Sequence, residues 1–159
     1  MGRRGVTGLE LGGEAPDFTL RDQFGQDVTL SSHRGSKAVL LLFYPNAFSG
    51  VCTGELAGIR ERLDEFMTFD SEVFALSCDP VYSVRAFADA EGLNFPLLSD
   101  FWPHGEVSRA YGVFDEGKGT PRRSSYVIDP EGRVAWAVHN ANPDGRDLDE
   151  HIAQLRALV

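Results

Sequence analysis

The sequence predicts an α/β sandwich, because strand and helix patterns alternate along the chain. Its clearest signal is the apolar run at residues 38–44, bounded by Pro45, which is typical of a strand buried on both faces of a sheet. An amphipathic segment from Thr53 to about Met67 follows, with apolar residues at helical spacing. A hairpin pattern and a last helix end the sequence, so the sheet is expected to be mixed.

The other elements follow from the same two periodicities. The remaining predicted strands are short apolar or β-branched runs between turn signals, at residues 18–20, 26–30, 72–77, 95–98, 125–128 and 133–138. The remaining predicted helices carry apolar residues three or four positions apart, at residues 81–91, 106–111 and 148–158. Polar and turn residues dominate the extended or loop segments at residues 10–16, 31–35, 115–121 and 140–147.

Length and composition narrow the class of protein. A chain of 159 residues without internal repeats or linker composition is expected to form one domain over residues 1–159. The formal net charge of −9 argues against nucleic acid as a partner, because phosphate binding needs a basic face. No apolar run approaches the roughly 20 residues that a membrane helix needs, and residues 1–8 lack the apolar core of a secretory signal. We therefore expect a cytoplasmic protein with no membrane partner.

The sequence offers no pattern for a metal or a cofactor. The histidines and cysteines lie far apart, without metal-ligand spacing, at His33, Cys52, Cys78, His104, His139 and His151. Neither a phosphate-binding nor a dinucleotide-binding glycine motif occurs. We therefore expect an activity that depends on side chains alone.

Cys52 lies where the buried strand leads into the first turn of the predicted helix. The free N–H groups and the positive end of the helix dipole favour a thiolate there, and a partly exposed thiolate is a nucleophile. A lone cysteine is more often a small buried residue of the core. The position of Cys52 alone leaves both interpretations open.

Pro45, Ser49 and Cys52 form the pattern P-x-x-x-S-x-x-C, which resembles the active-site motif of peroxiredoxins. Further blocks of the resemblance follow in the family's order, at A-P-D-F-T-L (15–20), F-P-L-L-S-D (95–100), Y-G-V (111–113) and R-x-x-Y-V-I-D (123–129). F-Y-P (43–45) and S-D-F-W-P-H-G (99–105) are most similar to the small bacterial one-cysteine peroxiredoxins of the alkyl hydroperoxide reductase E type. The resemblance implies a thioredoxin-like three-layer sandwich, with a central mixed sheet flanked by helices.

The resemblance also implies roles for three residues of the motif. Cys52 is expected to attack a peroxide oxygen and to become a sulfenic acid. The hydroxyl of Ser49, where the family more often has threonine, is expected to point at the thiolate or the bound peroxide, although it could also cap the helix. Pro45 is expected to shield the sulfur from water, although it could simply end the strand.

Positive charge at the site must come from another segment. The family's catalytic arginine falls six residues before the aspartate that ends the next hairpin strand, which points to Arg123 rather than its neighbour Arg122. An arginine suits this task because it stays charged and carries several donors in a fixed fork. Glu55 is expected to accept hydrogen bonds from that arginine, or else to be a first-turn acid that the helix dipole favours.

Cys78 leaves two mechanisms open. As a small buried residue it would take no part, and an external thiol would reduce the sulfenic acid of Cys52: a low-molecular-weight thiol, a glutaredoxin-like protein or thioredoxin. As a resolving residue it would form a disulfide with Cys52. The one-cysteine mechanism is the prediction, with hydrogen peroxide, organic hydroperoxides or peroxynitrite as substrates and a homodimer as the expected assembly.

The sequence argues against three rival interpretations. A thiol–disulfide oxidoreductase of the same fold needs a second cysteine where Glu55 stands. A glutathione peroxidase would need tryptophan and glutamine residues that do not occur here in the right order. The third rival is a catalytically silent binding or redox-sensing module of the same fold, against which the joint presence of Pro45, Ser49, Cys52 and Arg123 argues.

Overall fold

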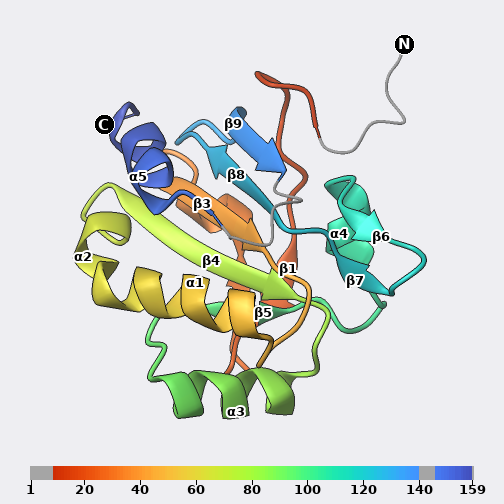
Figure 1. The fold of residues 1–159 in the computed structure, drawn as a ribbon. Coiled ribbons are helices and arrows are strands. Elements are labelled where there is room, and N and C mark those ends of the chain that lie inside the picture. Colours follow the sequence, from red (N-terminus) through yellow and green to blue (C-terminus); the bar gives the residue numbers. More distant parts are fainter. Residues whose placement is uncertain (1–8, 140–145, 159) are drawn as a thin grey trace.

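The computed structural model describes residues 9–139 and 146–158. Its centre is a seven-stranded mixed sheet with the strand order β2-β1-β5-β4-β3-β8-β9 (Figure 1). These strands are β1 (Thr19–Arg21), β2 (Asp27–Thr29), β3 (Ala38–Phe43), β4 (Ser71–Ser77), β5 (Leu97–Ser99), β8 (Ser124–Ile128) and β9 (Val134–His139). The predicted α/β class with a mixed sheet is confirmed.

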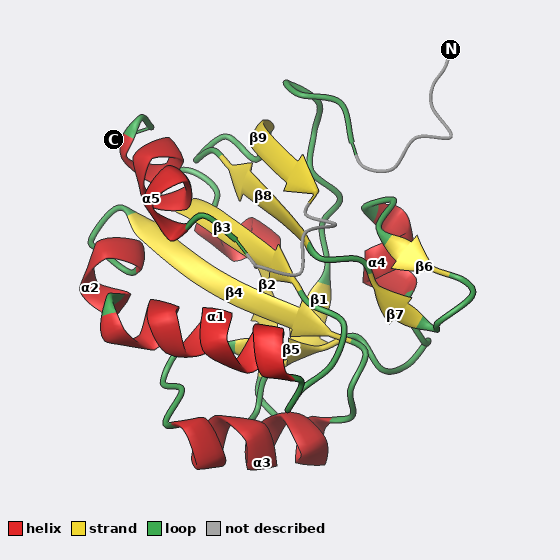
Figure 2. Cartoon of the chain, in the orientation of Figure 1, coloured by secondary structure: helices red, strands yellow, loops and turns green. Residues whose placement is uncertain are grey.

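Helices surround the sheet, as Figure 2 shows. They are α1 (Gly50–Glu61), α2 (Leu63–Phe66), α3 (Val81–Glu91), α4 (Glu106–Ala110) and α5 (Leu148–Arg156), with a 3-10 helix η1 (Leu30–His33). The three central strands β3, β4 and β5 run parallel, whereas β1, β2, β8 and β9 pair antiparallel at the two sides. None of the helices in the described ranges is both long and apolar enough to cross a membrane.

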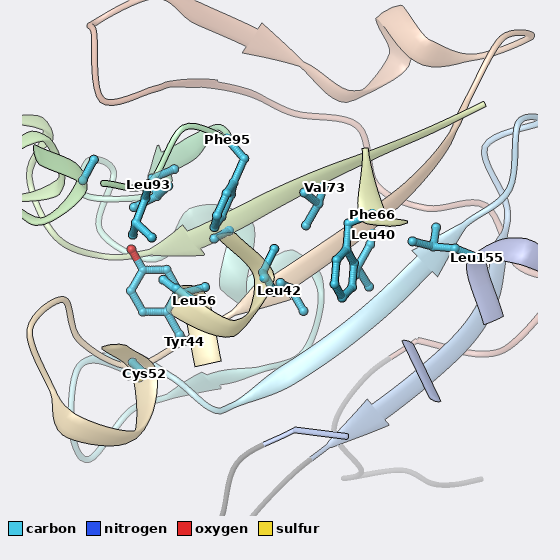
Figure 3. Packing of buried hydrophobic residues seen from close by; sticks show 14 of the residues in the cluster. Leu40, Leu42, Tyr44, Cys52, Leu56, Phe66, Val73, Leu93, Phe95 and Leu155 are labelled. Atoms are coloured by element: carbon cyan, nitrogen blue, oxygen red, sulfur yellow. The ribbon is translucent and has the colours of Figure 1, made fainter. Parts of the chain in front are cut away.

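Strand β3 divides the core in two because its side chains alternate between the faces of the sheet. Leu40 and Leu42 join a cluster that also contains residues of α1, α2, α3 and α5 (Figure 3). Leu41 and Phe43 join the second cluster, which contains residues of α4, η1 and the N-terminal segment. Every residue of β3 is buried, as its continuous apolar run predicts. The three layers are therefore helices, sheet, and a second cover of α4 with the N-terminal segment.

The predicted helix from Thr53 to Met67 differs from the structure in its start and its continuity. Helix α1 begins at Gly50, and Arg62, with φ −121°, separates it from α2. The apolar spacing continues across this break because Phe66 of α2 packs in the same core cluster as Ile59 of α1. A period of apolar residues cannot report a one-residue interruption of that kind.

Three loop predictions also change. Helix η1 (Leu30–His33) overlaps the end of the strand predicted at 26–30 and the turn predicted at 31–35. The predicted loop at 115–121 contains part of a two-stranded sheet of β6 (Phe114–Asp115) and β7 (Thr120–Pro121), whose strands are too short to show a period. Most of the loop predicted at 140–147 lies outside the described residues.

The β3–α1 loop carries the chain from the sheet to Cys52 and is held at two points. The Ala47 N–H donates to Oδ2 of Asp79, just after β4, over 2.9 Å. Phe48 has a left-handed backbone with φ 67°, and its ring packs on Phe87 of α3 with centroids 5.1 Å apart. Left-handed φ is uncommon for a residue other than glycine, so contacts around the loop must maintain it.

Candidate active site

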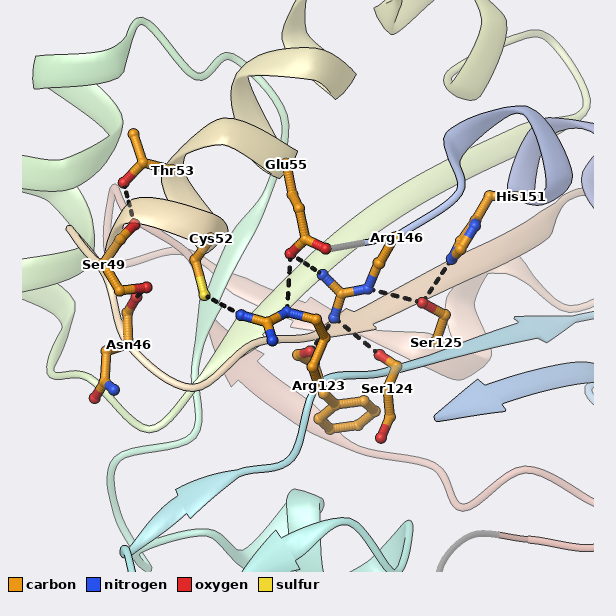
Figure 4. A network of polar contacts seen from close by, with 11 residues as sticks. Asn46, Ser49, Cys52, Thr53, Glu55, Arg123, Ser124, Ser125, Arg146 and His151 are labelled. Atoms are coloured by element: carbon orange, nitrogen blue, oxygen red, sulfur yellow. Dashed lines mark hydrogen bonds and ion pairs between the residues drawn. The ribbon is translucent and has the colours of Figure 1, made fainter. Parts of the chain in front are cut away.

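Cys52 lies in the first turn of α1, and Arg123 reaches it from the start of β8. The antiparallel register pairs Phe43 with Ser124, so Arg123 falls beside the end of β3, where the chain turns towards α1. Arg123 Nη2 lies 3.5 Å from Cys52 Sγ (Figure 4). The structure thus brings together two residues 71 positions apart, as the sequence predicts.

The sulfur is less accessible than expected. Cys52 has 0% exposure and packs in the core cluster with Tyr44 and Leu56, so the expectation of a partly exposed thiol is wrong. The first turn of α1 directs this side chain towards the sheet, and the sequence position alone does not reveal that direction. Arg123, whose side chain is 14% exposed, contacts both the sulfur and the outer groove described below.

Glu55 follows Cys52 by three residues in α1, so both side chains face the guanidinium of Arg123. Its Oε1 accepts from Arg123 Nε at 3.2 Å and from Arg146 Nη1 at 2.7 Å. Its Oε2 is buried without a hydrogen-bond partner among the described residues. Arg146 therefore fixes the carboxylate of Glu55, and this carboxylate in turn orients Arg123.

Arg146 belongs to the site and is not predicted from the sequence. Its side chain is completely buried and donates to Ser125 Oγ at 3.0 Å, to Ser124 O at 3.2 Å and to Phe43 O. Burial lowers the pKa of Arg146 to about 10, against the charge of Glu55, so the guanidinium stays protonated at neutral pH. In sequence it is one arginine in a polar segment, where exposure to solvent is the ordinary expectation.

These four side chains form a buried charge cluster: Cys52, Glu55, Arg123 and Arg146. With a neutral thiol, the two guanidinium groups and the one carboxylate give the cluster a net charge of +1. With a thiolate, the cluster is neutral. Because an unbalanced charge is costly away from water, a negative charge close to the two guanidinium groups lowers the electrostatic energy of the cluster.

Ser125 and His151 extend the network away from the sulfur. His151 Nδ1 lies 2.6 Å from Asp147 O, a carbonyl that can only accept, so Nδ1 carries the proton. His151 Nε2 then accepts from the Ser125 hydroxyl at 2.7 Å, and that hydroxyl accepts from Arg146. Burial lowers the pKa of His151, with a smaller contribution from the charge of Arg146, and outweighs the opposing hydrogen bond to Asp147 O. The imidazole is therefore neutral near pH 7.

Ser49 and Pro45 lie at the other end of the site. Ser49 occupies the N-cap position of α1, but its hydroxyl donates to Asn46 O at 3.1 Å instead of capping the helix. Among the described hydrogen bonds, this hydroxyl makes none to Cys52 Sγ. Pro45 is half-buried and lines the groove together with Arg123.

The sequence and the fold both match known proteins. Residues 11–137 match the AhpC/TSA family. The chain belongs to this family. Alkyl hydroperoxide reductase E of Mycobacterium tuberculosis is 49% identical over 151 residues, which cover 95% of this chain and 99% of that protein. Peroxiredoxin 2 of Thermoplasma acidophilum is 38% identical over 154 residues, which cover 93% of this chain and 75% of that protein.

Solved peroxiredoxin structures share the fold. Peroxidoxin BcpB of Mycobacterium tuberculosis has a TM-score of 0.84 at 32% identity, covering 95% of this chain and 99% of its own. AhpC of Enterococcus faecalis has a TM-score of 0.83 at 30% identity, covering 92% of this chain and 90% of its own. The predicted peroxiredoxin family, its thioredoxin-like fold and the thiol peroxidase class are thereby confirmed.

Cys78, the second cysteine of this AhpC/TSA chain, has the opposite electrostatic surroundings. It directly follows β4, is buried, and is a free thiol like Cys52. Burial, followed by the charge of Asp100, raises the pKa of the Cys78 thiol to about 12. Cys78 is therefore a thiol at neutral pH, whereas Cys52 faces a guanidinium.

An open groove of about 510 Å³ lies outside the charge cluster. Its lining residues come from the β3–α1 loop, the β6–β7 hairpin and the ends of β8 and β9: Pro45, Asn46, Asp115, Lys118, Thr120, Pro121, Arg122, Arg123 and His139. Within the described ranges, the histidine, cysteine, aspartate and glutamate side chains form no group of three or more that could hold a metal. Arg123 connects the groove to Cys52 Sγ.

Proposed function

We propose that the protein reduces hydrogen peroxide and organic hydroperoxides, and also peroxynitrite, through a sulfenic acid at Cys52. The observation that carries this proposal is the 3.5 Å contact of Arg123 Nη2 with Cys52 Sγ at the start of a helix. A guanidinium and a helix N-terminus both stabilise a thiolate. Membership of the AhpC/TSA family supports the same reaction.

The reaction is a displacement at oxygen. The Cys52 thiolate attacks one oxygen of the hydroperoxide, an S–O bond forms and the O–O bond breaks. The other oxygen leaves as an alkoxide or hydroxide and takes a proton, so sulfur is oxidised and the peroxide is reduced to an alcohol or water. Arg123 is placed to stabilise the negative charge, which lies on sulfur before the displacement and on the leaving oxygen after it.

The neighbouring residues have supporting roles in this proposal. Glu55 and Arg146 fix the guanidinium of Arg123, which lowers the cost of orienting it. Pro45 limits the access of water from the groove side. Ser49 binds the peroxide only if its hydroxyl leaves Asn46 O, so its proposed role includes a rotation of the side chain.

Regeneration follows the one-cysteine mechanism in our proposal. An external thiol attacks the sulfenic acid, releasing water and forming a mixed disulfide, which a second thiol reduces to restore Cys52. The protonated state of Cys78 supports this order, because a thiol is a poor nucleophile for an internal disulfide. The external thiol remains as predicted: a low-molecular-weight thiol, a glutaredoxin-like protein or thioredoxin.

We further propose a homodimer, a single domain over residues 1–159 and a cytoplasmic location. Exposed aromatic rings support the dimer: Phe48 is 57% and Trp102 is 81% exposed, and large apolar side chains favour interfaces. The two free cysteines are consistent with a reducing compartment. Sedimentation, limited proteolysis and cell fractionation test these three proposals, and a monomer at micromolar concentration would count against the first.

Intact mass spectrometry after one equivalent of hydrogen peroxide tests the chemistry. We expect the mass of one added oxygen in the wild type and in Cys78→Ser, and no addition in Cys52→Ser. Loss of two hydrogens instead, abolished in Cys78→Ser, would replace the one-cysteine mechanism with a Cys52–Cys78 disulfide. If Cys52 does not react, the peroxidase proposal is wrong, and the interpretation as a catalytically silent binding or redox-sensing module replaces it.

A further inference from the structure

The groove beside Cys52 contains two cations for which the described residues provide no ion-pair partner. The protein has 15 lysines and arginines against 24 acids, and in the described ranges most of these cations lie within 4.0 Å of a carboxylate. Three described cations, Lys118, Arg122 and Arg133, have no described carboxylate at that distance. Two of them, Lys118 and Arg122, line the groove.

The acidic residue in the groove does not cancel this charge by direct pairing. Asp115 Oδ1 accepts from the backbone N–H groups of Gly117 at 3.0 Å and Lys118 at 3.2 Å, so it closes the β6–β7 turn. The guanidinium of Arg122 donates to Phe114 O at 3.1 Å, which fixes it on the hairpin wall. Burial, and to a smaller extent the charge of Arg122, lowers the pKa of His139 on the facing strand β9. The positive charge of Arg122 therefore acts across the groove.

The size and lining of the groove fit a small organic acid. Its volume of about 510 Å³ falls in the range of small-molecule sites, whereas hydrogen peroxide needs only a small part of it. Pro45 and Pro121 offer apolar contact, and Lys118 and Arg122 offer charge. Arg123 lines the groove and contacts Cys52 Sγ, so a molecule held there has its reacting end near the sulfur.

We propose that Lys118 and Arg122 bind the carboxylate of an organic co-substrate of Cys52. This proposal rests on the proposed peroxidase function and names the substrate class that the groove selects. Two co-substrates can carry the carboxylate: an organic hydroperoxide that oxidises Cys52, or a thiol that reduces its sulfenic acid. Both reactions occur at the same sulfur, so the same groove serves either one.

The test compares matched pairs of co-substrates. For oxidation, the pair is cumene hydroperoxide and its para-carboxylate. For reduction of the sulfenic acid, the pair is 2-mercaptoethanol and 3-mercaptopropionate. Rates are measured by rapid quenching and intact mass in the wild type, in Lys118→Gln/Arg122→Gln, and in Arg133→Gln. Arg133 is the matched control because it too has no ion-pair partner among the described residues and lies outside the groove.

The measured quantity is the rate with the acid divided by the rate with its neutral partner. A general change in the reactivity of Cys52 cancels in this ratio. We expect the double substitution to lower the ratio about fivefold, since partly exposed charge pairs contribute a few-fold each. Arg133→Gln should leave the ratio at the wild-type value, and high salt should lower the wild-type ratio in the same direction.

Each outcome decides the proposal. A fall for the hydroperoxide pair alone identifies the oxidant as the carboxylate source, and a fall for the thiol pair alone identifies the reductant. If neither ratio falls while hydrogen peroxide oxidises wild-type Cys52, the groove proposal is wrong and the peroxidase function stands. If hydrogen peroxide does not oxidise wild-type Cys52, both are wrong. Lys118→Gln, at an exposed turn, provides a second variant with an expected effect of about twofold if the double variant does not fold.

Discussion

Replacing Arg146 tests the charge cluster most directly. Arg146→Met removes one of the two guanidinium partners of Glu55 Oε1 and leaves Phe43 O, Ser124 O and Ser125 Oγ without its donors. Breaking a buried ion pair by removing one partner costs about 3–5 kcal/mol. For a domain of this size, that loss lowers the Tm by on the order of 10 °C.

The same substitution should also change the chemistry. Without Arg146, a thiolate at Cys52 gives the cluster a net negative charge instead of neutrality. We expect the rate of Cys52 oxidation by hydrogen peroxide at pH 7 to fall on the order of tenfold and to recover partly at higher pH. Arg146→Lys keeps the charge but loses the planar fork, so it should fall between Arg146→Met and the wild type.

Urea unfolding and rapid-quench oxidation measure the two effects separately. Arg156→Met is the matched control on α5, because its side chain is 64% exposed and lies 4.0 Å from Glu65. It should change stability by at most about 0.5 kcal/mol. Unchanged stability and an unchanged pH–rate profile in Arg146→Met would refute the reasoning that Arg146 stabilises the cluster. A loss of stability without a change in the profile would refute only its role in the chemistry.

Three further predictions follow from the site. Arg123→Met should slow oxidation of Cys52 at pH 7 by about 100-fold or more, whereas Arg122→Met should slow it far less. Equal losses in stopped-flow kinetics would contradict the assignment of the catalytic role to Arg123 rather than Arg122. Iodoacetamide at pH 7.5 should alkylate Cys52 and spare Cys78, whose pKa is raised to about 12, and peptide mass mapping would contradict this if Cys78 reacted first. Since burial lowers the pKa of His151, the unfolded chain binds a proton more readily than the fold. Stability should therefore decline as the pH falls below about 6.5, by at most about 1.4 kcal/mol per pH unit for this group, and urea unfolding of His151→Gln should show a smaller slope.

Most of the fold could be predicted from the sequence because its central elements are long and strongly patterned. The all-apolar strand β3 and helix α3, which ends at Gly92 with φ 64°, have the predicted positions to within a residue. The β6–β7 hairpin could not be predicted, since two-residue strands carry no period. The break at Arg62 was hidden because the apolar spacing continues through it.

The site was predictable only where the family motif covers it. The structure brings Cys52, Glu55 and Arg123 together as expected, whereas Arg146 escaped because its partners are distant in sequence. Arg146 lies 91 residues from Glu55 and 103 residues from Phe43. A buried arginine in a polar segment has no local signature, since only the packing of α1, β3 and β8 brings its acceptors together. Pattern analysis therefore identifies the groups that react better than those that orient them.

The two cysteines show why charge, rather than burial, distinguishes a reactive thiol in this protein. Cys52 lies in the first turn of α1, which follows β3, whereas Cys78 directly follows the neighbouring strand β4. Both cysteines are buried. Burial disfavours the thiolate form of Cys78. At Cys78 the nearby Asp100 carboxylate adds to that effect. Cys52 Sγ instead faces the guanidinium of Arg123, which Glu55 and Arg146 hold in place. In our proposal, the fold therefore supplies two buried thiols, and the charge cluster at the start of β8 makes Cys52 the nucleophile.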